Sequence, residues 1–315
     1  MNIGLDVMGG DYAPDSTVEG ALLALEEINP EDVIYLFGDR DIISQKLKEK
    51  GFTSGNLEII HAPDIIFMAE QPIKAFTQKP KSSLATGFQY LKQNKIDSFA
   101  SAGNSGAMII GSMYTVKTID GIIRPCTSVS FPNEKGGYTL VLDIGTNPEP
   151  KPDVLYQFGI LGDIYARHVF NIENPRISLL NIGEEEEKGN MLIQSTYQFM
   201  KDSRDFNFIG NVEGRDILNA KADVIVCDGF TGNVVLKQVE GFYELLKRRG
   251  LTDSYVRKLD FVHHGGSPVL GINASVVVGH GISNAIAIKN MILLSQNIHE
   301  ADLFVHIKKA FSRYA

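Results

Sequence analysis

The chain has 315 residues, 43% of them hydrophobic and 22% charged, a composition typical of a folded protein with a full hydrophobic core. A net charge of -8, from 30 Lys and Arg against 38 Asp and Glu, repels phosphate polymers, so we expect no nucleic-acid binding. Two cysteines, Cys126 and Cys227, exclude a disulfide framework and favour a reducing, cytoplasmic setting. No apolar run approaches the ~20 residues of a spanning helix, and the amino terminus lacks the features of an export signal.

Short aliphatic runs alternate with helical stretches along the chain, and Gly or Asp turns separate them. In chain order the pattern predicts a strand at 3–8, a helix at 15–28, a strand at 33–37, a helix between Asp39 and Gly51, and strands at 57–61 and 98–101 separated by a helix at 83–94. It continues with a helix at 104–115, a strand at 138–144, a helix at 155–170, a strand at 177–182, a helix at 190–200, and strands at 206–209 and 224–227.

This strand and helix order predicts an α/β fold: a doubly wound, three-layer αβα arrangement around a mostly parallel sheet. No linker or repeat interrupts the pattern, so we expect a single catalytic domain over residues 1–315. In such a fold, ligands bind beyond the carboxyl ends of the strands.

Four turns follow predicted strands and combine glycine with small polar residues: 8–11, 101–106, 143–147 and 228–233. Glycine lets backbone N–H groups approach an anion, and a helix amino terminus carries about half a positive charge. Each turn alone also fits ordinary turn geometry, but together they are expected to converge on one anion. The candidate phosphate- and substrate-binding residues are Gly9, Gly10, Asp11, Ser101, Asn104, Ser105, Gly106, Asn147, Thr231 and Gly232. Asp11, like Asp228, is expected to hold its turn rather than face phosphate, because its charge repels an anion.

Several familiar motifs are absent from the sequence. No G-x-G-x-x-G follows the first strand and no G-x-x-x-x-G-K-[ST] occurs, which argues against a dinucleotide fingerprint and a nucleoside-triphosphate loop. G-x-S-x-G is also missing, so a nucleophile-elbow hydrolase has no support.

Lys188 follows four consecutive glutamates just beyond the strand at 177–182. The segment fits a solvated charge run, or it places a cation at the strand's carboxyl edge, where it holds phosphate or stabilises an oxyanion. Cys227 fits an inert core thiol better than a nucleophile for a covalent route. His264 and His280 lack metal-ligand spacing, so no metal is expected; both are candidates for substrate contact and for a general acid.

Five motifs carry a family resemblance: residues 8–11 (MGGD), 101–107 (SAGNSGA), 211–216 (NVEGRD), 227–237 (CDGFTGNVVLK) and 265–271 (GGSPVLG). Together they resemble the acyl-acyl-carrier-protein:phosphate acyltransferases of bacterial phospholipid synthesis. The resemblance implies transfer of a long-chain acyl group from acyl carrier protein to inorganic phosphate, and delivery of the acyl phosphate to a membrane glycerol-phosphate acyltransferase. It also implies a fold like that of isocitrate and isopropylmalate dehydrogenases, a homodimer and no cofactor.

The resemblance assigns catalytic roles to Lys188 and Asn233, both already candidates by position. In this chain only 238–260 stands where many relatives carry a long helical hairpin associated with membrane contact, so at most peripheral contact with the inner membrane face is expected. His264 stands where relatives often have Tyr, and no tyrosine role is transferred. The expected mechanism is direct attack of phosphate on the thioester, without metal or covalent intermediate.

A basic cluster ends an amphipathic helical segment at 236–260: Lys247, Arg248, Arg249, Arg257 and Lys258. It fits a docking site for the acidic carrier protein, or the solvated end of a helix that packs in a dimer. Three other functions share parts of the pattern: a phosphotransacetylase that uses acetyl-CoA, a dehydrogenase of the isopropylmalate type, and a non-catalytic regulator that binds phosphate or acyl carrier. The dehydrogenase lacks its expected dinucleotide contacts and paired-Asp magnesium site in this sequence.

Overall fold

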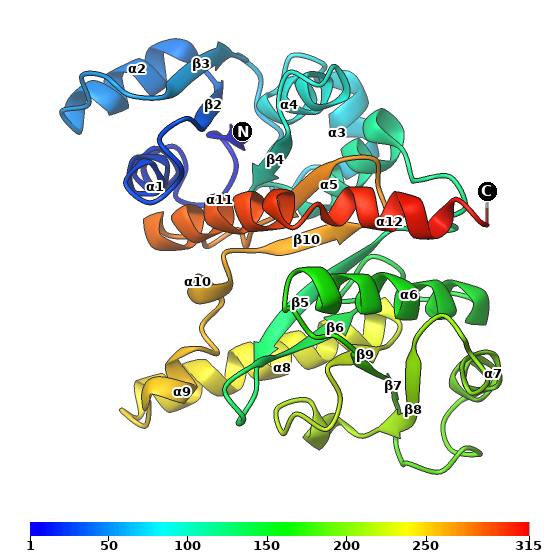
Figure 1. Ribbon diagram of the computed structural model, residues 1–315. Coiled ribbons are helices and arrows are strands. Elements are labelled where there is room, and N and C mark those ends of the chain that lie inside the picture. The colour runs from blue at the N-terminus through cyan, green and yellow to red at the C-terminus, as the bar shows by residue number, and fades with distance from the viewer. Residues whose placement is uncertain (315) are drawn as a thin grey trace. The chain divides into compact units, whose positions relative to one another are not determined.

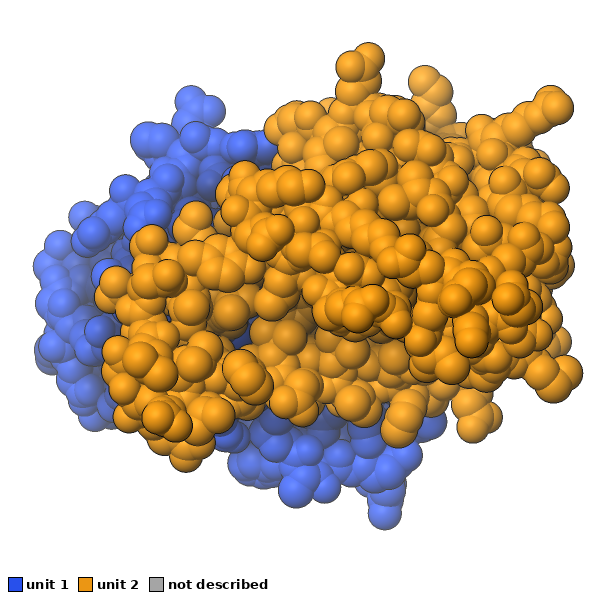
Figure 2. All heavy atoms as spheres, turned by 90° about the horizontal axis from the view of Figure 1, so that it is seen from below, with its two compact units in different colours: residues 1–118, 261–300 blue, residues 119–260, 301–315 orange. Residues whose placement is uncertain are grey.

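The computed structural model describes residues 1–314 and divides into two compact units (Figures 1 and 2). Unit 1 comprises residues 1–118 and 261–300, and unit 2 comprises 119–260 and the C-terminal residues from 301. The chain therefore builds most of unit 2 after residue 118, returns to complete unit 1 at 261–300, and then ends in unit 2. Within each unit the strands are largely parallel and flanked by helices, which confirms the predicted α/β class.

Unit 1 contains strands in the order β3-β2-β1-β4-β11-β10. Their bounds are β1 (Asn2–Asp6), β2 (Val33–Gly38), β3 (Leu57–His61), β4 (Ser98–Ser101), β10 (Ser267–Leu270) and β11 (Ser275–Val278). The helices are α1 (Asp15–Leu25), α2 (Arg40–Glu49), α3 (Pro72–Gln78), α4 (Ser83–Lys92), α5 (Ser105–Gly111), the π-helical turn η1 (Ser112–Val116), α10 (Phe261–His264) and α11 (Ala285–Glu300). All neighbouring strands are parallel except β10 and β11.

Helices cover both faces of the unit 1 sheet. On one face, Phe99 of β4 packs edge-on against Phe37 and Phe88, with ring centroids 5.7 and 5.1 Å apart. Because side chains alternate along a strand, the neighbouring Ala100 faces the other side, where α11 crosses β1, β4 and β11 and packs along α1 (Figure 1). The carboxyl ends of the parallel strands thus open onto the turns at 8–11 and 101–106.

Unit 2 contains strands in the order β5-β6-β9-β7-β8. Their bounds are β5 (Cys126–Pro132), β6 (Tyr138–Leu142), β7 (Arg176–Leu180), β8 (Asn207–Val212) and β9 (Val224–Val226). The helices are α6 (Pro152–His168), α7 (Met191–Met200), the 3-10 turn η2 (Gly214–Asp216), α8 (Gly229–Arg248), α9 (Ser254–Arg257) and α12 (Leu303–Phe311). Leu236 and Val239 of α8 pack on the core of one face, and α6 contacts β6, β7 and β9.

The predicted mostly parallel arrangement is confirmed, and the exceptions are the antiparallel pairs β10/β11 and β5/β6. The few residues between β5 and β6 allow only a hairpin. One prediction about local structure was wrong. The helix predicted over 104–115 ends at Gly111 and continues as the π-helical turn η1, where the N–H of Lys117 donates to the Ser112 carbonyl 2.9 Å away. No helix within residues 1–314 is long and apolar enough to cross a membrane.

Candidate active site

A buried carboxylate shapes the turn at 143–147 in unit 2. Asp143 is fully buried, and its Oδ1 accepts hydrogen bonds from the Thr127 hydroxyl (3.0 Å) and from the N–H groups of Gly145 and Thr146 (3.3 and 3.2 Å). Its Oδ2 accepts from the main-chain and side-chain amides of Asn147, at 2.6 and 2.9 Å. These donors offset the loss of water around the charge. The side-chain amide of Asn147, a predicted site residue, therefore stabilises the shape of the turn.

The second turn of unit 2, at 228–233, forms the amino terminus of the 20-residue helix α8. Asp228 caps the helix: its carboxylate accepts the N–H of Thr231 at 2.8 Å and the hydroxyl of Thr231 at 2.7 Å. The N–H of Gly229 donates to the carbonyl of Asn147 at 2.8 Å. The N–H of Phe230 has no acceptor among residues 1–314, so one amide at the positive end of this helix remains available to an anion.

Gly232 brings the two turns of unit 2 into direct contact. A β-carbon at this position would lie 1.8 Å from the carbonyl oxygen of Asp143, so only glycine fits. One residue later, the exposed Asn233 donates from Nδ2 to the carbonyl of Ile144 at 3.2 Å. The turns at 143–147 and 228–233 therefore pack directly against each other at the edge of the sheet.

Lys188 lies in the loop at 181–190, which leaves the same edge. Strands β6, β7 and β9 are parallel, and both Leu142 and Leu179 pair with Val226, so all three strands end side by side. The Lys188 side chain is exposed, and its ammonium forms no ion pair within residues 1–314. Two of the four glutamates before it have other partners: Glu184 pairs with Lys221, and Glu186 pairs with Lys201 at 3.1 Å.

The cysteines are buried in unit 2. Burial, with a smaller contribution from nearby Asp228 and Asp143, raises the pKa of the Cys227 thiol well above its usual value, and its Sγ donates to the Asp143 carbonyl at 3.4 Å. Burial likewise raises the pKa of Cys126. Neither thiol is suited to act as a nucleophile.

In unit 1 a buried aspartate that the sequence reasoning missed joins the turns at 8–11 and 101–106. Asp6 accepts the hydroxyl of Ser101 at 2.6 Å and the N–H of Met8 at 3.1 Å, and the Ser101 hydroxyl accepts the N–H of Gly103 at 2.9 Å. Burial raises the pKa of Asp6, while these hydrogen bonds oppose the shift. The signal was available: a lone Asp ends an apolar strand directly before the turn that holds Gly9 and Gly10.

Asn104 is buried and its side chain is fully engaged. Oδ1 accepts the N–H of Ala107 and caps α5, at 3.0 Å. Nδ2 donates to the carbonyls of Phe67, Met68 and Glu70 at 3.1, 3.2 and 3.0 Å. Asn104 thus ties the loop at 67–70 to the start of α5. The main-chain N–H groups of the next two predicted residues, Ser105 and Gly106, have no acceptor among residues 1–314.

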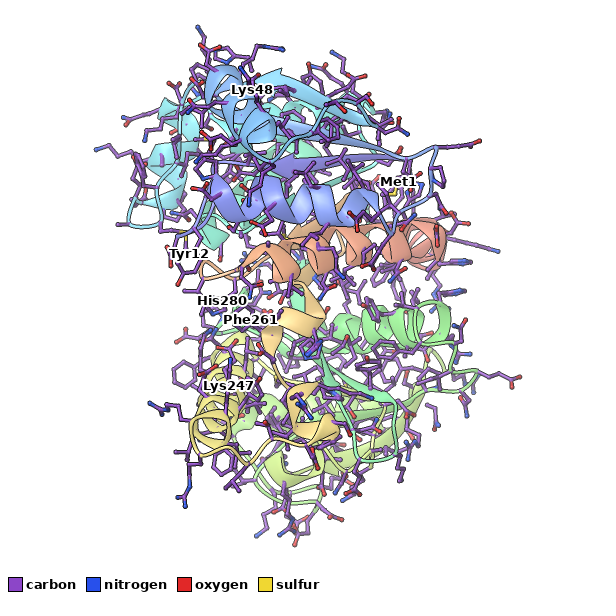
Figure 3. The ribbon with its side chains drawn as sticks, turned by 90° about the vertical axis from the view of Figure 1, so that its left-hand side faces the viewer. Met1, Tyr12, Lys48, Lys247, Phe261 and His280 are labelled. Carbon is purple, nitrogen blue, oxygen red and sulfur yellow. The ribbon has the colours of Figure 1, made fainter. Side chains whose placement is uncertain are left out.

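A third turn, at 279–282, joins this cluster in unit 1. The N–H of Asp11 donates to the carbonyl of Gly281 at 2.8 Å. The ring of His280 packs on Phe261 with centroids 5.0 Å apart (Figure 3). His264 ends the short helix α10, which packs on α11. The structure therefore places Asp11 and His280 together. The convergence of all four glycine turns on one ligand stays a prediction.

The basic cluster lies at the ends of α8 and α9. Lys247, labelled in Figure 3, covers the ring of Tyr243 and lies 3.8 Å from the carboxylate of Asp260. Arg257 donates to the carbonyl of Asp253 at 3.2 Å. The remaining members, Arg248, Arg249 and Lys258, are exposed and form no ion pair among residues 1–314. The segment predicted over 236–260 is thus the second half of α8, a break at 249–253, and α9.

Comparison with known proteins identifies relatives along the whole chain. Residues 1–249 match a family described as fatty acid synthesis protein. A phosphate acyltransferase from Dictyoglomus turgidum is 41% identical, with 95% of this chain and 94% of the relative covered. One from Clostridioides difficile is 39% identical, with 100% of this chain and 97% of the relative covered.

Solved structures share the fold at low sequence identity. A phosphotransacetylase from Streptococcus pyogenes superposes with a TM-score of 0.64 at 15% identity, covering 95% of this chain and 94% of its own. A EutD phosphotransacetylase from Staphylococcus aureus gives a TM-score of 0.62 at 14% identity, with 94% of each chain covered. At this identity the likeness concerns the fold alone.

Proposed function

Because the chain belongs to the phosphate acyltransferase family, and so is an enzyme of that type, we propose that it transfers a long-chain acyl group from acyl carrier protein to inorganic phosphate. The product of this proposal is an acyl phosphate, a substrate for a membrane glycerol-phosphate acyltransferase. The proposal includes a homodimer that acts in the cytoplasm with at most peripheral membrane contact.

The observation that carries the proposal is the ammonium of Lys188, which has no carboxylate partner within residues 1–314 although four glutamates precede it. Asn233 and the available N–H of Phe230 lie in the first turn of α8, at the same edge of the unit 2 sheet. A cation and a helix amino terminus together suit a doubly charged phosphate.

The chemistry needs only orientation and charge stabilisation. An oxygen of hydrogen phosphate attacks the thioester carbonyl carbon, the tetrahedral intermediate collapses, and the carbon–sulfur bond breaks. The proton of hydrogen phosphate ends on the departing carrier thiol, so the products are acyl phosphate and free carrier. Lys188 and Asn233 hold the attacking phosphate or the oxyanion, and donors of this kind are each worth about 10²-fold or more in rate.

The other predicted residues support the site indirectly. Thr231 and Asn147 direct side-chain hydrogen bonds into their own turns, and Asn104 caps α5 and holds the loop at 67–70, so we assign all three to backbone shape. In unit 1, the N–H groups of Ser105 and Gly106 are the groups we assign to anion contact. Arg248 and Arg249 form the docking surface for the acidic carrier.

The test is a phosphate-dependent assay with purified protein, palmitoyl-acyl-carrier-protein and inorganic phosphate. Mass spectrometry follows acyl phosphate and free carrier, and reactions without phosphate serve as the control. We expect acyl phosphate only when phosphate is present. A preference for acetyl-CoA over the carrier-bound acyl group would instead make the protein a phosphotransacetylase, and carrier binding without release would make it a regulator.

A further inference from the structure

The loop that carries Lys188 contains five consecutive charged residues at 184–188, yet uncharged side chains hold its backbone. Three carboxamides donate hydrogen bonds to its main-chain carbonyls: Asn181 from the end of β7, Asn211 from β8 and Gln194 from α7. Together they hold the carbonyls of residues 185, 187, 188 and 189. The three donors come from three different elements of unit 2, so the loop is fixed from several sides.

Asn181 connects the start of the loop to its end. It is 9% exposed, its Oδ1 accepts the N–H of Ile182 at 2.8 Å, and its Nδ2 donates to the carbonyl of Lys188 at 3.1 Å. The following residue, Gly189, has φ +90, and a β-carbon there would lie 2.3 Å from Asn181 Oδ1. The backbone directly after Lys188 is therefore pressed against the end of the strand.

Asn211 restrains the backbone N–H of Lys188 indirectly, through the carbonyl of Glu185. It is 4% exposed, and its Nδ2 donates to the carbonyl of Glu185 at 2.9 Å. The same carbonyl accepts the N–H of Lys188 at 3.2 Å. Gln194 completes the set, with bonds from Nε2 to the carbonyls of Glu187 and Gly189 at 2.7 and 3.0 Å. Both backbone groups of Lys188 thus belong to this network.

The type of side chain matters as much as its position. A carbonyl needs a donor, and a carboxamide supplies one without a charge. An aspartate in place of either asparagine would have no N–H to donate to the loop carbonyl, and its carboxylate oxygens would face that carbonyl instead. The network therefore restrains the loop through its main chain and makes no bond to the ammonium of Lys188.

We infer that Asn181, Asn211 and Gln194 are positioning residues, which hold Lys188 in place and do not touch substrate. This inference rests on the proposed function, since it assigns their effect to the step that Lys188 assists. Misplacement of a catalytic group by about 1 Å can lower turnover about 10²-fold. Loss of one carboxamide is expected to lower kcat 10- to 100-fold and to leave KM for the carrier unchanged.

The test compares two exposed glutamines one turn apart on α7. Gln194→Ala removes two bonds to the loop backbone, whereas Gln198→Ala removes only a bond to the side chain of Glu186, at 2.6 Å. We expect the first variant to lose kcat and the second to retain it. Asn181→Ala and Asn211→Ala should behave like Gln194→Ala. In a Lys188→Ala background, none of these changes should lower kcat further, because their effect acts through Lys188.

Hydrogen exchange of the amides at 183–190 gives a readout that is independent of turnover. Exchange should rise in Gln194→Ala and stay at the wild-type level in Gln198→Ala. Unchanged exchange, or an equal loss of kcat with and without Lys188, would overturn the positioning role. If the wild-type protein forms no acyl phosphate, the proposed function falls, while raised exchange in Gln194→Ala still supports the restraint of the loop.

Discussion

The carbonyl oxygen of Asp143 occupies the space that a side chain at Gly232 would need, because a β-carbon at residue 232 would lie 1.8 Å from it. The first turn of α8 therefore packs directly on the turn that follows β6. This contact sets the position of Asn233, whose side-chain amide reaches the carbonyl of Ile144. A glycine without any functional group thus determines where a proposed catalytic side chain lies.

Gly232→Ala should destabilise the protein by about 1–3 kcal/mol or more, because the added methyl group must displace backbone. Gly241→Ala is the matched control on the same helix: beyond its chain neighbours and the adjacent backbone of α8, nothing lies within 4 Å of its would-be β-carbon. This control should stabilise the protein by roughly 0.5–1 kcal/mol, since alanine is the better helix former. Denaturant unfolding measures both, and similar midpoints for the two variants would contradict the packing argument.

Lys188→Ala and Asn233→Ala should each lower kcat about 10²-fold or more without unfolding the protein, because each removes a donor to phosphate or to the oxyanion. Lys201→Ala is the control for Lys188, since this nearby lysine pairs with Glu186 at 3.1 Å. Steady-state kinetics with carrier-bound acyl donor give the comparison. Near-wild-type turnover in both folded variants would remove the basis of the proposed mechanism.

We expect the stabilising contribution of Asp6 to the free energy of unfolding to decrease as the pH rises and its carboxyl group loses its proton. Burial raises its pKa above the ordinary 3.8, so the folded chain holds the proton more tightly than the unfolded chain. Stability linked to Asp6 is therefore full below pH 3.8 and is lost as the pH rises from there through the folded-state pKa. Asp6→Asn removes this titration.

Unfolding free energies of wild type and Asp6→Asn, measured from about pH 4 to 8, test the sign. The difference should move in favour of the variant as the pH rises, then level off above the folded-state pKa. A difference that stays constant over the whole range would show that Asp6 does not titrate as its burial requires.

Reversal of the charges in the basic cluster should weaken the binding of acyl carrier protein. Arg248→Glu together with Arg249→Glu is expected to raise KM for acyl carrier protein and to leave the unfolding temperature unchanged, because both side chains are exposed and unpaired among residues 1–314. The control is the pair Lys308→Glu and Lys309→Glu on α12, an equal change of charge at another exposed helix of unit 2. Equal KM values for the two double variants would exclude the docking surface.

Cys126 and Cys227 should resist thiol reagents in the native protein, since burial raises both pKa values and leaves no thiolate. Both should react fully in denaturant, which serves as the control. Detection of an acyl thioester on Cys227 during turnover would contradict the direct attack of phosphate.

The sequence supports the α/β class because local signals agree with the tertiary structure there. Asp39 is predicted to cap a helix, and its side chain accepts the N–H groups of Asp41 and Ile42. Strands 57–61 and 98–101 match their observed bounds. The prediction omits β5, β10, β11 and α11, and with them the two antiparallel pairs β5/β6 and β10/β11.

The candidate site is harder to predict, because a polar residue in a turn can either face a ligand or build the turn. Asn104 and Asn147 were selected as binding residues, yet the side chain of Asn104 caps α5 and bonds to the loop at 67–70, and that of Asn147 bonds to its own turn. Asn181 was not selected, although it holds the loop of Lys188. All three are asparagines that follow the end of a strand, and only the hydrogen-bond partners distinguish them.

During synthesis, unit 1 cannot be completed until the ribosome has made most of unit 2, because unit 1 consists of residues 1–118 and 261–300. Strand β4 lies between β1 and β11, and β11 is synthesised only after residues 119–260 of unit 2. Until then, one edge of β4 lacks its partner and α1 lacks α11. The nascent protein therefore carries an open strand edge while most of its second unit emerges.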